Sequence, residues 1–388
     1  MTPDTTHRNS ARPRPALWCA RAACVGFGLL AFGCGTTPPV REGAVDESPA
    51  YTMVFVIHGD GNYHYHDDDG NDHAADRETV AKALAIARDS PRAEVMIFHE
   101  SERRHVLFFI PRHDGRAYHY RNGRLIAESS YWRDQGVAPF DPEVRLYHAF
   151  SAGRPAPPLR LFLYFGHELP ELGERGYDVS YPERTVTIDD LADGMEAMAG
   201  DSTRFDLVIL GTCYGGTPRS IGAIASCARY VVASPDNLHL SYFDLEPLRS
   251  LDDVARRGDV ASFADHFARN AFMKLSDGVQ TGVSVAVYDI DLVHPFVQSV
   301  TGTYNEALLA TGSRADPPRE RCDCAEDARY RLPGIDAGVT MYYRSPRFGR
   351  QRTNQEHSGW ECWRVRAEAD SSSASPGTAA DPETTPGS

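Results

Sequence analysis

The feature of this sequence that most limits its fold is a regular alternation between short apolar runs and amphipathic segments. The apolar runs have four to eight strand-forming residues and are bounded by turn residues, as buried strands usually are. They lie at residues 51–59, 93–100, 159–168, 204–213, 229–236 and 284–293.

Helical spacing of apolar residues marks the segments between several of these runs, at 74–90, 187–200 and 262–277. The second segment begins with a Thr/Asp cap signal and ends on glycine. Strands that alternate with helices predict an α/β fold, in which a mainly parallel sheet carries helices on both faces. The continuous apolar character of the runs agrees with this, because parallel strands are buried on both sides.

Two hairpin signals interrupt the alternation between the second and third runs. They are Asp114-Gly115 and Asn122-Gly123, each flanked by strand-like residues. Such dipeptides favour the tight turns that join antiparallel strands. The sequence therefore predicts antiparallel hairpins beside the parallel strands.

The first 34 residues resemble an export signal. Four arginines precede a short apolar run, "CVGFGLLAFG", and Cys34 follows Gly33 directly. This arrangement predicts a signal peptide over 1–34, with Cys34 as the lipidated residue of a bacterial lipoprotein. Residues 35–50 then read as a tether.

The remaining chain is predicted to contain one α/β domain over 51–312 and a small extension over 313–366 that contains cysteines. The Ser/Pro/Thr-rich end, 367–388, is predicted to be disordered because such a composition cannot bury a core. In an exported chain, an even set of cysteines favours disulfides without fixing their pairing. That set is Cys227, Cys322, Cys324 and Cys362.

The net charge of −14 argues against nucleic acid as a partner, because binding phosphates requires an excess of lysine and arginine. It is compatible with an exported protein, either a lipoprotein of the cell envelope or a secreted one. Contact with a membrane is expected only through the lipid anchor.

Reactive side chains stand at the ends of three predicted strands: His58, His167 and Cys213. Ligands of open α/β sheets bind at the carboxyl ends of strands. A thiol becomes an effective nucleophile when a histidine takes its proton or lowers its pKa. Glycines at 211, 215 and 216 allow the chain to turn sharply around Cys213 and leave amides free for an oxyanion.

The order of these motifs resembles the clostripain-like cysteine peptidases of the caspase-like clan. The resemblance is carried by a strand that ends in His167, a Thr-initiated helix, "FDLVILGTCYGG" and "YVVASPD". His167 also lies 46 positions before Cys213, a separation that suits that family. The resemblance covers about residues 51–300 in order and about 160–245 at the level of motifs, and it implies a caspase-like fold.

The resemblance implies an exported cysteine endopeptidase that acts on proteins or peptides and needs no cofactor for its chemistry. Cys213 would be the nucleophile and His167 the general base. The amides of Glu168 and Cys213 would form the oxyanion hole. The family has an acidic residue two positions before the cysteine, where this chain has Gly211. The resemblance therefore implies that Gly211 and Asp236 contact the substrate, with Asp236 as the nearby replacement for the acid.

Two alternatives use the same residues. One is a catalytically silent binding protein on the same fold. The other is an α/β-hydrolase, because "GTCYGG" matches a nucleophile elbow with cysteine in place of serine and "VFVIHGDG" resembles an oxyanion loop. In that hydrolase, His294 would be the base and Asp236 its orienting acid.

The segment "HGDGNYHYHDDDGNDH" is rich in metal-binding side chains. It partly matches a calcium loop in which Gly70 takes the sixth position and Asp67 and Asp69 act as ligands, with Asp72 following. His64, His66 and Asp68 also approach a transition-metal motif. The loop is therefore predicted either as a solvated acidic loop, as a Ca²⁺ site or as a transition-metal site.

Overall fold

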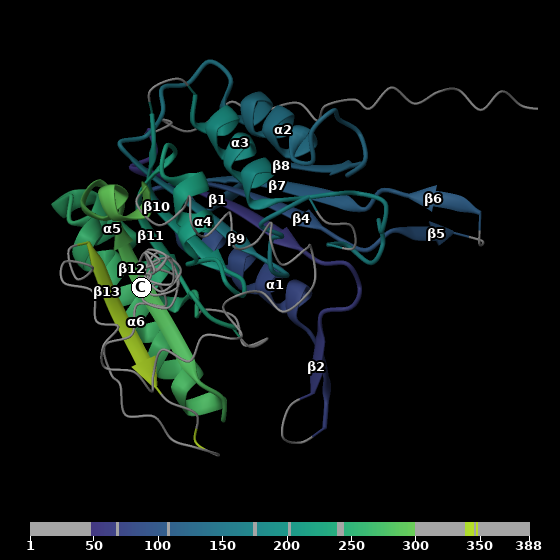
Figure 1. Ribbon diagram of the computed structural model, residues 1–388. Coiled ribbons are helices and arrows are strands. Elements are labelled where there is room, and N and C mark those ends of the chain that lie inside the picture. Colours follow the sequence, from purple (N-terminus) through teal and green to yellow (C-terminus); the bar gives the residue numbers. More distant parts are fainter. Residues whose placement is uncertain are drawn as a thin grey trace, which may run out of the picture. The chain divides into compact units, whose positions relative to one another are not determined.

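A central sheet organises the part of the chain that the computed structural model describes (Figure 1). Nine strands of these residues follow the order β13-β12-β11-β10-β9-β1-β4-β7-β8. The structure describes residues 48–66, 70–106, 109–173, 177–200, 203–238, 244–298, 338–344 and 347. These all belong to one compact unit, Val45–Ser388.

The five central strands run parallel to one another. They are β11 (Ala228–Ala233), β10 (Phe205–Gly211), β9 (Leu159–Phe165), β1 (Tyr51–His58) and β4 (Ala93–Glu100). Antiparallel strands complete each side: β12 (Val283–Asp289) and β13 (Val339–Arg344) on one, β7 (Gly115–Arg121) and β8 (Arg124–Tyr131) on the other. The predicted sheet, mainly parallel with antiparallel additions, is confirmed.

Helices cover both faces of this sheet, as predicted. On one face, α1 (Ala75–Asp89), α5 (Leu251–Arg257) and α6 (Val260–Gly278) share a hydrophobic core with the strands. On the other face, α2 (Asp141–Ser151), α3 (Ile188–Ala199) and α4 (Pro218–Ile224) form a second core. Figure 1 shows α2 and α3 on one side of the strands and α1 and α6 on the opposite side.

Strand β1 shows how the sequence builds this arrangement. Successive side chains of a strand point to opposite faces, so Met53 and Phe55 enter the core on the α1 and α6 side, while Val54 and Val56 enter the core on the α3 side. All four are fully buried. A run that is apolar at every position therefore makes a strand that is covered on both faces.

Small elements lie outside the main sheet. A hairpin of β2 (His64–His66) and β3 (Asp72–Ala74) precedes α1, and a hairpin of β5 (Arg104–Val106) and β6 (Ile110–Arg112) follows β4. A short 3₁₀ helix, η1, spans Glu246–Ser250. The predicted cap of α3 is confirmed, because the Thr187 side chain accepts from the Asp190 amide and the Asp190 carboxylate accepts from the Thr187 amide.

One of the two predicted hairpin turns is confirmed. Asn122 and Gly123 join β7 to β8 with φ of 51° and 76°, the left-handed conformation that such turns require. Asp114-Gly115 is not a turn of this kind, because Gly115 is the first residue of β7 and pairs with Glu100 and Tyr131. A Cβ atom on Gly115 would lie 2.3 Å from the Tyr131 ring, so close packing rather than a turn requires glycine here.

The C-terminal segment contributes to the sheet. Residues 339–344, which the sequence analysis placed in a separate extension, form β13 along β12. The rest of the predicted extension, the signal segment with Cys34, the tether and the tail lie outside the described residues, except for a few positions next to β1 and β13. No helix in the described ranges is both long enough and apolar enough to cross a membrane.

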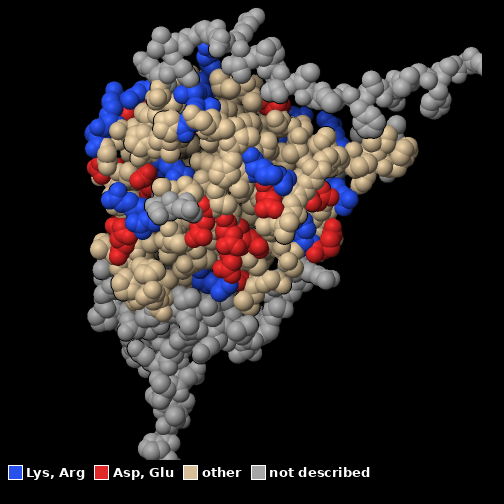
Figure 2. Space-filling model, turned by 90° about the horizontal axis from the view of Figure 1, so that it is seen from above, with Lys and Arg blue, Asp and Glu red and all other residues tan. Residues whose placement is uncertain are grey.

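Acidic side chains gather on the face seen in Figure 2, with basic side chains around them. The α3 helix contributes a group of neighbouring acids: burial raises the pKa of Asp193, and the charges of Glu196, Asp190 and Asp189 raise it further. The absence of nucleic acid among the partners stays a prediction from the net charge.

Candidate active site

The carboxyl ends of β9 and β10 bring His167 and Cys213 to one edge of the sheet. The two strands are parallel neighbours, and Phe165 is paired with Gly211 at the last position of their ladder. His167 and Cys213 each follow two residues later. The two segments that follow these strands stay in contact, because the Thr212 hydroxyl donates to the His167 carbonyl at 2.6 Å.

A tight turn presents Cys213 between β10 and α4. Tyr214 has a φ of 53°, which is strained for a residue with a bulky side chain. Two backbone hydrogen bonds hold the turn, from the Tyr214 amide to the Asp236 carbonyl at 3.0 Å and from the Gly216 amide to the Ser234 carbonyl at 2.8 Å. The turn is therefore tied to the segment that follows β11.

The thiol of Cys213 is half-buried and lies close to polar groups of this same segment. Its sulfur donates to Asn237 Oδ1 at 3.0 Å and to the Leu238 carbonyl at 3.4 Å. Strained turns and partly exposed thiols are typical of functional sites.

Cys227 provides the contrasting case. It is a free, fully buried thiol in the core beneath α3 and α4, and burial raises its pKa to about 12. The prediction that Cys227 belongs to a disulfide set is therefore wrong, because its side chain is packed as a small apolar group. Cys322, Cys324 and Cys362 lie outside the described residues.

His167 is held by two residues of the loop after β1. Its Nε2 lies 3.3 Å from Asp60 Oδ1, and the Tyr63 ring packs edge-on against the imidazole with the ring centroids 4.3 Å apart. The Tyr63 hydroxyl donates to the Gly166 carbonyl at 3.0 Å. The histidine ring is thus fixed on one side, while a third of its side chain remains exposed.

Asp60 is buried and ionised. Burial alone would raise the pKa of its carboxyl, but hydrogen bonds from His167 and from the amides of Asn62 and Val179 lower it below its usual range. A carboxylate on one ring nitrogen orients a histidine and stabilises its protonated form. Since Asp60 contacts Nε2, Nδ1 is the nitrogen that remains for exchanging a proton.

Burial raises the pKa of Tyr63, and the nearby charge of Cys213 raises it further. Tyr63 therefore lies close to both the predicted nucleophile and the predicted base. The sequence analysis did not single out Asp60 or Tyr63. The available signal was their place in the loop after β1, the strand that pairs directly with β9.

The remaining predicted residues differ in position. Glu168 is half-buried directly after His167. Asp236 is exposed, its carboxylate accepts from the Ser284 hydroxyl at 3.0 Å, and its carbonyl supports the Cys213 turn.

Gly211 is buried, and a Cβ atom there would lie 2.2 Å from the Phe165 ring. The prediction that Gly211 contacts substrate is therefore not supported by its position, because Phe165 fills the space above it.

His294 lies far from Cys213. It follows β12, which is antiparallel to β11, so the end of β12 lies beside the start of the parallel strands. Asp291, three residues before His294, pairs with Arg204 at the amino end of β10 at 2.9 Å. The length of β10, about 20 Å for seven residues, separates that end from Cys213. His294 as the base of a nucleophile elbow is therefore excluded by the topology.

The predicted metal loop is only partly described. Asp67 and Asp69 lie outside the described residues, and Asp72 is an exposed residue that opens β3 and pairs with His66 across the hairpin. Ca²⁺ binding by this loop stays a prediction.

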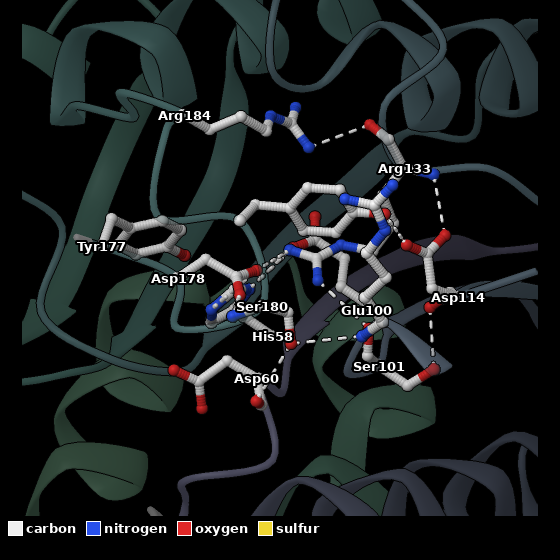
Figure 3. Close-up of polar contacts among 12 residues, drawn as sticks. His58, Asp60, Glu100, Ser101, Asp114, Arg133, Tyr177, Asp178, Ser180 and Arg184 are labelled. Carbon is white, nitrogen blue, oxygen red and sulfur yellow. Dashed lines mark hydrogen bonds and ion pairs between the residues drawn. The ribbon is translucent and has the colours of Figure 1, made fainter. Parts of the chain in front are cut away.

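A buried polar cluster lies beside the His167 site and was not foreseen from the sequence (Figure 3). Arg133 is at its centre and its Nη2 donates to Glu100 Oε2 at 3.0 Å and to Asp178 Oδ2 at 2.6 Å. His58 is part of the cluster, with its ring centroid 6.2 Å from that of His167. Burial would raise the pKa of Glu100, but the Arg133 charge and the His58 hydrogen bond lower it to about 2.

Comparisons with known proteins return a small set of solved structures. No protein-family model matches the sequence, and a search of curated proteins found no similar one. The chain is similar to an inactive zymogen of a C11 protease from Parabacteroides distasonis, with 14% identity, a TM-score of 0.45 and coverage of 68% of each chain. It is also similar to a secreted C11 cysteine protease from Bacteroides thetaiotaomicron that was solved with an irreversible peptide inhibitor. That likeness has 13% identity and a TM-score of 0.45, and covers 67% of this chain and 71% of the other.

Proposed function

We propose that the chain is a cysteine endopeptidase in which Cys213 is the nucleophile, His167 the general base and Asp60 the residue that positions His167. The observation that carries this proposal is the strand register, which ends β9 and β10 at the same level and leaves a thiol and an imidazole two residues beyond. The contacts of Asp60 and Tyr63 with the histidine ring support it.

The first chemical step uses the orientation of the ring. The Cys213 thiol gives its proton to Nδ1 of His167, and the imidazolium that forms is stabilised by the ionised Asp60 at Nε2. The thiolate then attacks the carbonyl carbon of a peptide bond. A tetrahedral intermediate results, in which the carbonyl oxygen carries the negative charge.

The turn around Cys213 supplies what the next steps need. Amides of Cys213 and Glu168 are the proposed donors to the oxyanion. The imidazolium returns its proton to the leaving amine, so that the C–N bond breaks and an acyl-enzyme thioester remains. His167 then takes a proton from water, whose hydroxide releases the new carboxyl end and regenerates the thiol.

The substrate is a peptide, and we propose that Asp236 favours a cationic side chain on the acyl side of the cleaved bond. Asp236 is exposed and its backbone supports the Cys213 turn, whereas Gly211 has no room for an acid. We also propose that the protein is exported and anchored by lipid at Cys34, on the sequence features of residues 1–34.

Digestion of a peptide library tests this function. The protein is incubated with peptides of mixed sequence, and new termini are identified by mass spectrometry. We expect cleavage after lysine or arginine, abolished when the protein is first treated with iodoacetamide. Asp236→Asn should lower the preference for these residues by about fivefold, the effect of losing one exposed charge interaction of roughly 1 kcal/mol.

Asp265→Asn is the matched control, since the Asp265 carboxylate on α6 accepts a hydrogen bond from the Tyr342 hydroxyl on β13, outside the site. A protein that cleaves no peptide, or that cleaves equally well after alkylation, would contradict the proposed function. Equal preference for basic residues in Asp236→Asn and in the unmodified protein would contradict only the role of Asp236.

A further inference from the structure

His58, the last residue of β1, has a fully buried ring whose two nitrogen atoms have different surroundings. Its Nδ1 lies 2.8 Å from Glu100 Oε2, and the side chain has no solvent exposure. A carboxylate only accepts hydrogen bonds, so Nδ1 carries a hydrogen, and in the neutral ring Nε2 presents a lone pair. Arg133 Nη2 is 3.2 Å from the same Nδ1 and donates to the shared Glu100 oxygen instead.

The Nε2 atom of this ring has no hydrogen-bond partner among the residues that the structure describes. Its nearest charged neighbour is Asp178 Oδ2 at 3.8 Å, which is too long for a hydrogen bond. Buried polar atoms without a partner are rare and require an explanation. Here the unpartnered nitrogen faces Asp178 Oδ2, which already accepts a hydrogen bond from Arg133, so an electrophile between the two atoms would give Nε2 the partner that it lacks.

The cluster around His58 has more negative than positive charge. Figure 3 shows its members. Two guanidinium groups, Arg133 and Arg184, take part in its contacts. They face four buried carboxylates, those of Asp60, Glu100, Asp114 and Asp178. An excess of two negative charges remains, and one divalent cation would balance it.

Three of these residues have the spacing of a metal site. One ligand atom each of His58, Asp60 and Asp178 lie within 4.8 Å of one another, and all three residues are buried. Ligands at about 2.0–2.2 Å from a common ion stand roughly 3–4 Å apart, so the 3.8 Å between His58 Nε2 and Asp178 Oδ2 fits two ligands of one ion.

We propose that His58, Asp60 and Asp178 bind a divalent transition-metal ion of the Zn²⁺ type, with water in the remaining position. A metal-binding imidazole usually donates its other N–H to a carboxylate, and Glu100 takes that role at Nδ1. The amides of Ser180 and Val179 donate to Asp178 Oδ1 and Asp60 Oδ2 and so orient both acidic ligands.

The donor set decides the class of ion. Imidazole nitrogen suits zinc and its neighbours in the first transition series, whereas Ca²⁺ takes only oxygen ligands, six to eight of them. The site shares no residue with the acidic loop at 67–72. Through Asp60 the ion would also fix the carboxylate that contacts His167, but its binding does not depend on whether Cys213 is a nucleophile.

Metal analysis of the full-length protein tests the site. The protein carries Cys213→Ala, so that this half-buried thiol cannot bind the ion, and it is expressed with added Zn²⁺ or Co²⁺ because the site is buried. We expect one ion per chain after desalting, retained during brief exposure to a chelator. The Co²⁺ form should absorb in the visible region without the charge-transfer band of a thiolate ligand.

Variants locate the ion. His58→Gln and, separately, Asp178→Asn should each lower retained metal by at least tenfold, while His99→Gln should retain it. His99 is the matched control because it lies on β4, the strand next to β1, and its ring also contacts a carboxylate. Its Nε2 is 3.0 Å from Asp76 Oδ2, and both side chains are half-buried. Circular dichroism identifies any variant that does not fold. In that case the proposal is tested by the Co²⁺ spectrum of the parent protein, which should show visible absorption without the charge-transfer band of a thiolate.

Two results would overturn the proposal. One is no ion retained by the folded parent protein. The other is equal retention in folded His58→Gln and Asp178→Asn, which would place the ion elsewhere in the chain. If the parent protein retains no ion but the unmodified protein cleaves peptides, the metal site is contradicted and the proposed function is not.

Discussion

Replacing either Cys213 or His167 by alanine is expected to lower peptide turnover by at least ~100-fold, the smaller end of what a general base contributes. The double variant should be no slower than the slower single variant, because a nucleophile and its base act as one unit. The measurement is kcat/KM on the best library peptide, with circular dichroism to confirm that each variant folds.

Two controls separate this account from its rivals. Cys227→Ala removes the buried thiol and should leave kcat/KM within a few-fold, since Cys227 lies in the core beneath α3 and α4. His294→Ala should also be harmless, because His294 follows β12 at the opposite end of the parallel strands. Loss of turnover in His294→Ala but not in His167→Ala would contradict the assignment of the base.

The second large effect concerns stability and falls on Arg133. Arg133→Met keeps the length of the side chain but leaves Glu100 and Asp178 buried without their guanidinium partner. Removing one partner of a buried ion pair typically costs about 3–5 kcal/mol. We expect a loss of that size in the free energy of unfolding at pH 7, measured by denaturant titration.

The pH dependence of this loss gives a sharper test. In the unmodified protein the pKa of Glu100 is lowered from 4.5 to about 2, so its contribution to stability is present above pH 4.5 and is lost as the pH falls toward 2. In Arg133→Met the buried carboxylates can be neutralised by protons, so the destabilisation should shrink between pH 7 and pH 5. A loss that is constant over this range would contradict the charge argument.

Arg116→Met is the matched control for Arg133→Met. Arg116 lies on β7, is about half exposed and is 3.8 Å from Glu128. Exposed pairs contribute about 0–1 kcal/mol, so this variant should unfold close to the unmodified protein. An equal loss in both variants would mean that burial of the Arg133 cluster is not the cause.

The parallel core of the sheet could be predicted because its strands are apolar at every position, as Val54, Phe55 and Val56 illustrate. The juxtaposition of His167 and Cys213 followed from one rule, that parallel neighbours end at the same edge. The Asn122-Gly123 turn was also predictable, since only a few dipeptides accept its left-handed backbone.

The polar cluster could not be predicted, because its members come from distant segments. Glu100 and Asp178 lie 33 and 45 positions from Arg133 along the chain. Charged residues are usually exposed, so nothing local marks these three as buried partners. Asp114-Gly115 was misread for a related reason, since the Asp114 carboxylate accepts from the Arg133 amide and Gly115 packs on Tyr131.

Strand β13 was missed because the direction of a strand and the strand with which it pairs are decided by the tertiary fold. Residues 339–344 are half-buried at every position except the exposed Thr340, and in the sheet they pair with β12. The acid expected near Gly211 is absent because Phe165 occupies the space, and that contact is visible only once β9 and β10 are paired.

The most direct measurement of the central claim is the rate at which iodoacetamide modifies each thiol at neutral pH. Mass spectrometry of the folded protein separates Cys213 from Cys227, whose pKa burial raises to about 12. Because only the thiolate reacts, we predict that Cys213 is modified at least ~10-fold faster than Cys227 and that His167→Ala slows Cys213 alone. A Cys213 that stays unmodified, or that reacts at the same rate in folded His167→Ala, would contradict the account.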